Sequence, residues 1–328
     1  MTSVLVPDKS HTSKVPTLIA DAGATASRRF LEFFTATIRN RNTRSAYASA
    51  VARFCRWCEC RGFSLELIEP ITAAAYIEEL GQTHAAPSVK QHLAALRVLF
   101  DWLVTGQILP HNPLASVRGP RHVVKRGKTP VLSTEDARKL LDSIPLTRRM
   151  PDGSQVPDLI GLRDRALIGV MVFSFARVSA TVGMCGRDFY QNGKRWWFRF
   201  QEKGGKFHEV PAHHTAEAYL DAYTSIAGSN PDSALFRSAS RQANVLTERA
   251  MSRGDTLRMI KRRARCAGIS PTTCCHTFRA TGITAFLSNG GTIENAQAIA
   301  AHESPRTTKL YDRTSDEITL DEVERIRI

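Results

Sequence analysis

The sequence lacks a hydrophobic run long enough to cross a membrane. Its longest apolar stretch, ALIGVMVFSFA at residues 166–176, is far shorter than the roughly 20 residues that a spanning helix needs. The opening residues, MTSVLVPDKSHTSK, also lack the apolar core of a signal peptide. We therefore expect a cytoplasmic protein with no membrane partner.

Cysteine is scarce and its spacing fits no known framework. Seven cysteines are an odd number in a long chain, which argues against a set of disulfides. Cys55, Cys58 and Cys60 lie in a stretch with helical apolar spacing, and no second ligand pair follows at zinc-finger distance. We interpret these thiols, and the CCH run at residues 274–276, as buried or half-buried side chains rather than metal ligands.

Acidic residues are too few to balance the basic ones. The chain has 45 Lys and Arg against 31 Asp and Glu, a formal net charge of +14 at pH 7. This excess indicates a polyanionic partner, nucleic acid before membrane, although a merely basic protein would show the same charge. There is no P-loop and no carboxylate cluster suited to two Mg²⁺ ions. We therefore expect no cofactor.

The length of 328 residues favours two domains. Residues 1–23 have few periodic apolar positions and are expected to be flexible. Apolar spacing of three and four residues then predicts an all-helical domain over 24–117. Its helices are predicted at 24–39, 42–61, 70–82 and 87–106, the second capped by Asn42-Thr43 and ending at Gly62.

A basic segment, RGPRHVVKRGKTP at residues 118–130, follows the helical block and contains no acidic residue. It is predicted to be an interdomain linker. A solvated linker would have a similar composition, but the charge also suits a strap along a phosphate backbone. The candidate DNA-binding residues are Arg118, Arg121, Lys125, Arg126 and Lys128.

The second block, residues 131–328, is again mainly helical, with one interruption. Ser133 is predicted to cap its first helix, with Asp136 at the capping-box position. Within residues 190–213, Asn192-Gly193 is a hairpin turn signal, WWFRF alternates like a half-buried strand, and KGGK forms a second turn. We expect a mainly α domain with a small three-stranded antiparallel sheet.

Several polar side chains of this block are candidates for chemistry. Arg177 follows the apolar run VMVFSFA, where a charge must be paired or face a cleft. His276 and Arg279 are three residues apart and share a helix face. Taken singly, each has an ordinary structural explanation. The full set, in chain order, is Arg177, Lys203, His276, Arg279, His302 and Tyr311.

The order of these residues resembles the tyrosine recombinase (phage integrase) family, particularly its Xer-like branch. That family has an arginine in G-x-R-x-S-E, a lysine in K-G-x-K-x-R, then H-x-x-R, G-H and a final tyrosine. FARVSATVGM places Arg177 on the first arginine, and EKGGKFHEVP places Lys203 on the lysine. HTFR matches the third motif, and AAHESPRTTKLY matches the last two. In the first block, NTRSAYASAVARFCRWC resembles the core-binding domain of that family.

The chemistry of this set fits phosphoryl transfer. Attack on a phosphodiester places negative charge on the non-bridging oxygens, which Arg177 and Arg279 would hold. The resemblance implies that Tyr311 is the nucleophile and forms a 3′-phosphotyrosine. A phenol has an unperturbed pKa of about 10 and so needs a proton acceptor, for which we expect His276.

Two more residues complete the expected site, and two positions depart from the family pattern. His302 would hydrogen-bond the phosphate or orient the site, and Lys203 would protonate the departing 5′-oxygen. Lys206, three residues further on, is an alternative to Lys203. Ala180 replaces the usual acidic residue, and Ala301 replaces the glycine before the second histidine.

The resemblance implies a two-domain DNA clamp that acts as a site-specific recombinase. Four subunits would assemble on two DNA sites and exchange strands through a Holliday junction. The tail TSDEITLDEVERIRI has helical spacing and would dock on a neighbouring subunit, although folding back onto its own subunit is an alternative. Two rivals are a type IB topoisomerase-like enzyme and a non-catalytic DNA-binding protein on the same scaffold. The complete set of six residues argues against the second rival.

Overall fold

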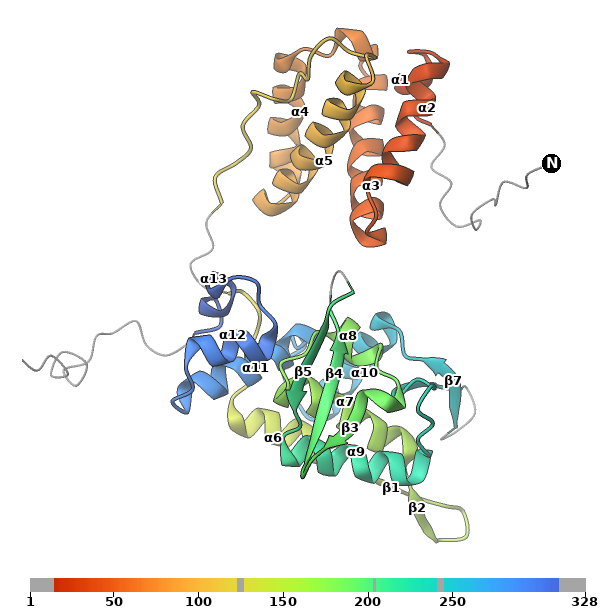
Figure 1. Ribbon diagram of the computed structural model, residues 1–328, viewed down its shortest axis with the longest axis vertical. Coiled ribbons are helices and arrows are strands. Elements are labelled where there is room, and N and C mark those ends of the chain that lie inside the picture. Colours follow the sequence, from red (N-terminus) through yellow and green to blue (C-terminus); the bar gives the residue numbers. More distant parts are fainter. Residues whose placement is uncertain (1–14, 123–126, 203–204, 241–244, 313–328) are drawn as a thin grey trace, which may run out of the picture. The chain divides into compact units, whose positions relative to one another are not determined.

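The computed structural model describes residues 15–122, 127–202, 205–240 and 245–312. The chain divides into two compact units, residues 1–123 and 124–328 (Figure 1). Both units are mainly helical, and the second contains a small antiparallel sheet. The predicted fold class is therefore confirmed, while the domain limits expected from the sequence remain a prediction.

Unit 1 is helical throughout its described part. Its elements are α1 (Thr17–Ala20), α2 (Ala24–Glu32), the π-helical η1 (Phe33–Thr37), α3 (Arg41–Glu59), the 3₁₀ turn η2 (Leu65–Leu67), α4 (Pro70–Thr83) and α5 (Ala86–Thr105). The apolar faces of these helices meet in one core around Phe54, Leu96 and Phe100. The four predicted helical patterns are thus confirmed, with small shifts at their ends.

Three local predictions for unit 1 are wrong. Residues 15–23 are not flexible, because Leu18 and Ile19 are buried in the core, whereas residues 1–14 lie outside the described part. The cap of α3 is Asn40, whose side chain accepts hydrogen bonds from the amides of Asn42 and Thr43. Cys60 is exposed rather than buried, because it follows the last turn of α3.

Unit 2 has more elements. In chain order they are α6 (Thr134–Asp142), β1 (Thr147–Arg149), β2 (Gln155–Pro157), α7 (Leu159–Phe173), α8 (Val178–Val182), η3 (Gly186–Asp188), β3 (Phe189–Asn192), β4 (Arg195–Gln201), β5 (Phe207–Pro211), α9 (His214–Ala227), β6 (Arg237–Ala239), β7 (Leu246–Ala250), α10 (Arg253–Cys266), α11 (Cys275–Ser288), α12 (Ile293–Ala300) and α13 (Pro305–Lys309). Helix α7 is buried on nearly all sides and packs against α9 and α11. The helical framework of unit 2 is therefore organised around α7.

The predicted three-stranded sheet is confirmed as β3-β4-β5, with both pairs antiparallel. The turn between β3 and β4 contains Gly193 at φ 62°, a left-handed conformation that glycine adopts without steric cost. Phe198 and Phe200 of β4 point into the core. The short β1-β2 and β6-β7 pairs were not expected, since strands of three to five residues carry little alternation.

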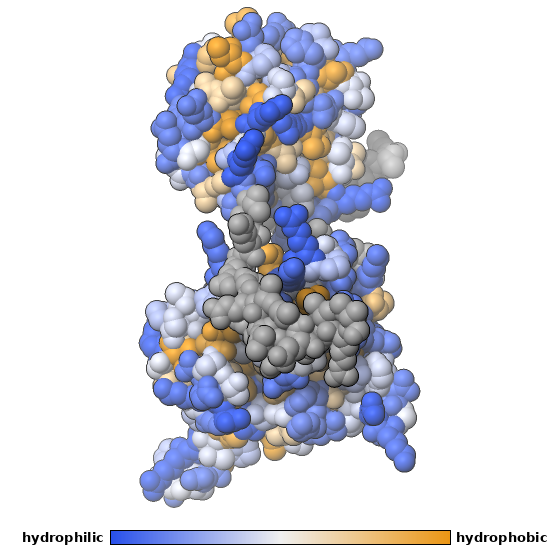
Figure 2. All heavy atoms as spheres, turned by 90° about the vertical axis from the view of Figure 1, so that its left-hand side faces the viewer, coloured by the Kyte–Doolittle hydropathy of each residue, from blue (hydrophilic) through white to orange (hydrophobic). Residues whose placement is uncertain are grey.

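Several further predictions concern the surface and the segments between elements. Ser133 caps α6 by accepting a hydrogen bond from the amide of Asp136 at 3.0 Å, as predicted. Arg118, Arg121 and Lys128 are exposed, while Lys125, Arg126 and residues 313–328 of the tail lie outside the described part. Hydrophilic side chains cover most of the visible face of each unit (Figure 2). Among the described residues, no helix has the length and apolarity needed to span a bilayer.

Candidate active site

Five of the six candidate residues come from segments that converge in unit 2. Arg177 precedes α8, His276 and Arg279 lie on α11, and the last two follow α12 and α13. Helix α12 lies beside β5 (Figure 1), where the ring Nε2 of His208 donates to the carbonyl of Ile299 at 2.9 Å. The sheet and the helices that carry the site are therefore tied together directly.

Arg279 is the most deeply held of these residues, with 1% of its surface exposed. Its guanidinium donates to the carbonyl of Phe175 through Nη1 and to that of Ala300 through Nη2, the latter at 2.7 Å. Burial, and then the charge of Arg177, lower its pKa to about 10. The group therefore remains charged at neutral pH, and its orientation is set by two backbone carbonyls.

The backbone near Arg279 is strained at two non-glycine positions. Phe175, whose carbonyl accepts from Arg279, has φ 55°, and Ala301, which follows the other acceptor, has φ 47°. Left-handed conformations are costly for residues with a Cβ and persist only where the surrounding structure enforces them. Ala301 ends α12 in the geometry that glycine adopts most easily, which explains the glycine of the family pattern at this position.

Arg177 is paired with a carboxylate that the sequence did not indicate. Its Nη1 lies 2.5 Å from Oε2 of Glu202, just beyond the end of β4. The Arg177 side chain is 36% exposed and that of Glu202 is 11% exposed. The expected alternatives for Arg177 were an ion pair or a cleft, and the structure shows an ion pair in which the Arg177 side chain stays partly exposed.

His276 lies in the first turn of α11 and has an exposed edge. Desolvation on its packed side, followed by the charges of Arg279 and Arg177, lowers the pKa of its imidazole. A lowered pKa keeps the ring neutral at pH 7, so it can accept a proton. The neighbouring Cys274 and Cys275 are half-buried, as interpreted from the sequence.

His302 and Tyr311 form a stacked pair. Their ring centroids are 5.8 Å apart with an interplanar angle of 11°. Nδ1 of His302 and the hydroxyl of Thr308 lie 2.8 Å apart, and the His302 ring is 7% exposed. Burial, then the charges of Arg279 and Arg177, lower the pKa of His302 to about 3. His302 is therefore neutral in the folded protein at pH 7.

Tyr311 itself is buried, with 9% exposure, although the preceding helix α13 is largely exposed. Its amide donates to the carbonyl of Thr308, and its carbonyl accepts from the hydroxyl of Thr284 on α11, both at 2.9 Å. These bonds hold the tyrosine backbone against the helix that carries Arg279. Thr284 and Thr308 were missed at the sequence level, because a threonine in a helix carries no distinguishing signal.

The lysine cannot be placed in the same way, since Lys203 lies outside the described residues. Lys206 is exposed, and its carbonyl accepts from the amide of Glu202 at 2.8 Å. The amide of Gly205 also donates to the carbonyl of Glu202, at 3.2 Å. The assignment of the general acid to Lys203 rather than Lys206 therefore stays a prediction.

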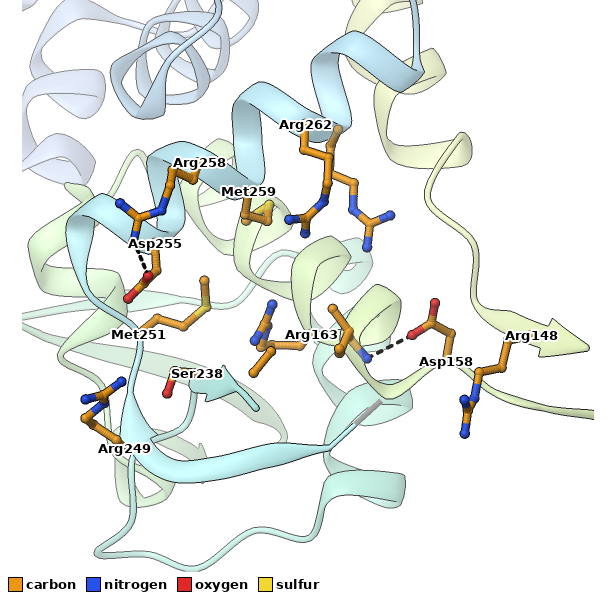
Figure 3. A pocket seen from close by; sticks show the side chains of 13 residues that line it. Arg148, Asp158, Arg163, Ser238, Arg249, Met251, Asp255, Arg258, Met259 and Arg262 are labelled. Carbon is orange, nitrogen blue, oxygen red and sulfur yellow. Dashed lines mark hydrogen bonds and ion pairs between the residues drawn. The ribbon is translucent and has the colours of Figure 1, made fainter. Parts of the chain in front are cut away.

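A separate arginine-lined cavity of about 580 Å³ lies between α7, α10 and the β6-β7 pair (Figure 3). It contains none of the candidate catalytic residues. Asp164 is fully buried and forms ion pairs with Arg163 at 2.6 Å and with Arg263 at 2.8 Å. Asp255 similarly pairs with Arg258. Four of the six lining arginines therefore share two carboxylates, so the cavity keeps an excess of positive charge. The ion pairs of Asp164 join α7 to α10.

Comparison with known proteins shows which sequences and folds this chain is similar to. The chain is 26% identical over 273 residues to the tyrosine recombinase XerD of Chlorobaculum tepidum, covering 82% of this chain and 85% of that protein. Its fold is similar to that of the XerH site-specific recombinase bound to a palindromic difH substrate in a post-cleavage complex (TM-score 0.68, 17% identity, 92% and 94% coverage). A lambda integrase tetramer bound to a Holliday junction has a TM-score of 0.65, with 18% identity and coverage of 89% and 78%.

The family assignment covers both units. Residues 28–107 match the phage integrase N-terminal SAM-like domain. Residues 132–317, more than half of the chain, match the phage integrase family itself. The resemblance inferred from the five motifs is confirmed: this chain belongs to the phage integrase family of tyrosine recombinases.

Proposed function

We propose that the converging residues perform DNA strand cleavage and rejoining, with Tyr311 as the nucleophile. The protein, as a member of this family, is a site-specific DNA recombinase that works through a phosphotyrosine intermediate. The observation that carries the assignment of residues is the convergence of two guanidiniums, two neutral histidines and one tyrosine in unit 2. Such a set can supply charge stabilisation, a proton acceptor and a nucleophile.

In the cleavage step, the Tyr311 oxygen attacks the scissile phosphorus, and the bond from phosphorus to the 5′-oxygen breaks. The phenolic proton passes to His276, which is neutral and able to accept it. The departing 5′-oxygen takes a proton from a lysine, which we assign to Lys203. Religation reverses these transfers, when a 5′-hydroxyl attacks the phosphotyrosine and releases Tyr311. Because the ester conserves the bond energy, no nucleotide is consumed.

Charge on the phosphate is met by the arginines. Arg279 uses one N–H of each terminal nitrogen for carbonyls of the protein, which leaves other donors for phosphate oxygens. His302 contributes a neutral hydrogen bond: if the Thr308 hydroxyl donates to Nδ1, then Nε2–H faces the phosphate. Such preorganised donors typically contribute about 10²–10³-fold each to the rate.

The assembly we propose has four subunits on two double-stranded DNA sites, with exchange through a Holliday junction. A lambda integrase of similar fold is found as a tetramer on such a junction, which supports this arrangement. Arg118, Arg121 and Lys128 are exposed and can meet phosphates. The apolar residues beyond residue 313 recur at helical spacing, and the family resemblance implies that this tail docks on a neighbouring subunit.

The direct test uses Tyr311→Phe and a nicked suicide substrate that traps the covalent adduct, in excess EDTA and without ATP. We expect wild-type protein to form an adduct under these conditions and Tyr311→Phe to bind DNA without forming one. The control is Tyr223→Phe, because Tyr223 is a buried tyrosine of the same unit whose hydroxyl donates to the carbonyl of Leu235. An adduct with Tyr311→Phe would contradict the assignment, and a wild-type requirement for Mg²⁺ would contradict the metal-free mechanism.

A further inference from the structure

Helix α8 lacks the acid that its family pattern contains. Ala180 occupies that position, is 3% exposed and packs in the main core of unit 2. A carboxylate is nevertheless present beside Arg177, and it comes from a different element. Glu202 reaches Arg177 from the end of β4, 25 residues further along the chain.

We propose that Glu202 is a positioning residue that holds Arg177 in its phosphate-binding orientation, the role left vacant by Ala180. This inference rests on the proposed function, since it assigns Arg177 to the scissile phosphate. The contact is single: Oε2 of Glu202 meets Nη1 of Arg177. Among the described residues, no hydrogen bond or ion pair engages Nε or Nη2 of Arg177. One edge of the guanidinium is therefore anchored while the other can bind a phosphate.

The electrostatics of the site support the same role. The charge of Arg177 lowers the pKa of Arg279, and the charge of Glu202 raises it. Two guanidiniums this close repel one another, and a carboxylate between strand and helix reduces the cost of keeping both charged. Because the Glu202 side chain is only 11% exposed, water screens this interaction less than it would at the surface.

The backbone of Glu202 is itself well anchored. Its amide donates to Lys206 and its carbonyl accepts from Gly205, so the residue begins a closed turn. Strand β5, which pairs with β4, is fastened to α12 through His208 and Ile299. The carboxylate is therefore presented from the same framework that holds Arg279 through Ala300.

The test compares Glu202→Gln with a matched control, Glu209→Gln. Glu209 is exposed, lies in the same sheet and pairs with Arg199 and Tyr190, so its replacement makes the same charge change away from the site. Both variants are assayed for adduct formation on two suicide substrates. One has a normal scissile phosphodiester, and the other has a neutral methylphosphonate, whose transition state needs less help from an arginine.

We expect Glu202→Gln to slow cleavage of the phosphodiester by about 10- to 100-fold, because a displaced Arg177 guanidinium stabilises the transition state less well. Its rate on the methylphosphonate should stay within about threefold of wild type, and Glu209→Gln should match wild type on both. Equal slowing on both substrates would indicate a structural role and refute the proposal. Unchanged or faster cleavage would also refute it, the latter by showing that Glu202 competes with DNA.

Two further outcomes are distinguished by additional measurements. If Glu202→Gln fails to fold, judged by thermal unfolding, Glu202→Asp is tested on the same pair of substrates. Its carboxylate is withdrawn from Arg177 by one methylene, so the same selective defect on the phosphodiester is expected, and its absence would refute the proposal. Failure of the wild-type protein to form any adduct would instead refute the proposed function.

Discussion

Gly282 is the position where helix packing and catalysis are most directly coupled. It lies on α11, three residues after Arg279, at the contact with the end of α7. A Cβ added there would meet the carbonyl oxygen of Val172 at 2.1 Å and the ring of Phe175 at 2.8 Å. Ordinary carbon–oxygen contacts are about 3.3 Å, so Gly282→Ala requires α11 and α7 to separate by about 1 Å.

The cost of this separation can be estimated. Overpacking of a core typically costs about 1–3 kcal/mol, and each kcal/mol lowers the Tm of a unit of this size by about 2–4 °C. The Phe175 ring is one of the groups displaced, and the carbonyl of the same residue is an acceptor of Arg279. A displacement of about 1 Å in a catalytic group can reduce the rate by about 10²-fold. We therefore expect Gly282→Ala to lose stability and cleavage activity together.

Thermal unfolding and the rate of adduct formation on a suicide substrate measure the two effects. Gly254→Ala is the matched control, because its Cβ would meet nothing closer than 3.5 Å on α10. Replacing an exposed glycine of a helix by alanine usually stabilises the protein by about 1 kcal/mol, so this control should be neutral or stabilising. A Gly282→Ala protein as stable and as active as wild type would show that the approach of the two helices does not position Arg279.

Three other predictions address the strain, the protonation state and the charge of this protein. Ala301→Gly should stabilise unit 2 by about 1 kcal/mol, because Ala301 is left-handed at φ 47°, whereas Ala298→Gly inside α12 should destabilise it by about the same amount; equal effects of the two in thermal unfolding would argue against strain. Because the pKa of His302 is lowered from 6.5 to about 3 on folding, the unfolded state binds the proton first as the pH falls. The stabilisation that this shift provides is complete above pH 6.5 and declines towards pH 3, with a loss of about 2 kcal/mol at pH 5. Urea unfolding above pH 6.5 and at pH 5 should show this loss for the wild-type protein and not for His302→Gln. The same pH dependence in both proteins would contradict the assignment to His302. Neutralising Lys125, Arg126 and Lys128, three of the five basic residues of the linker, should weaken binding to all DNA sequences alike. It should also reduce the salt slope by up to about 0.9 for each phosphate that is no longer neutralised, whereas an unchanged slope would make the linker a spacer.

The class of protein and the identity of most candidate residues follow from the amino-acid sequence alone. Period-3.6 apolar spacing predicted the helices, Asn192-Gly193 predicted the β3-β4 turn, and five ordered motifs indicated the family. These features are local: caps, turns and spacing depend on neighbours within a few residues. The N-cap of α3 was predicted at Asn42 but lies at Asn40, because a nearby residue of the same type can take the same role.

The way in which the candidate residues are held depends instead on packing between distant segments. The carbonyls that orient Arg279 belong to Phe175 and Ala300, 104 and 21 residues away. The carboxylate beside Arg177 comes from Glu202, which no spacing rule connects to it. Burial is likewise a property of the whole packed unit, so the low pKa of His302 could not be read from its neighbours in the chain. Residue types are encoded locally, whereas hydrogen-bond partners and desolvation arise when distant segments pack together.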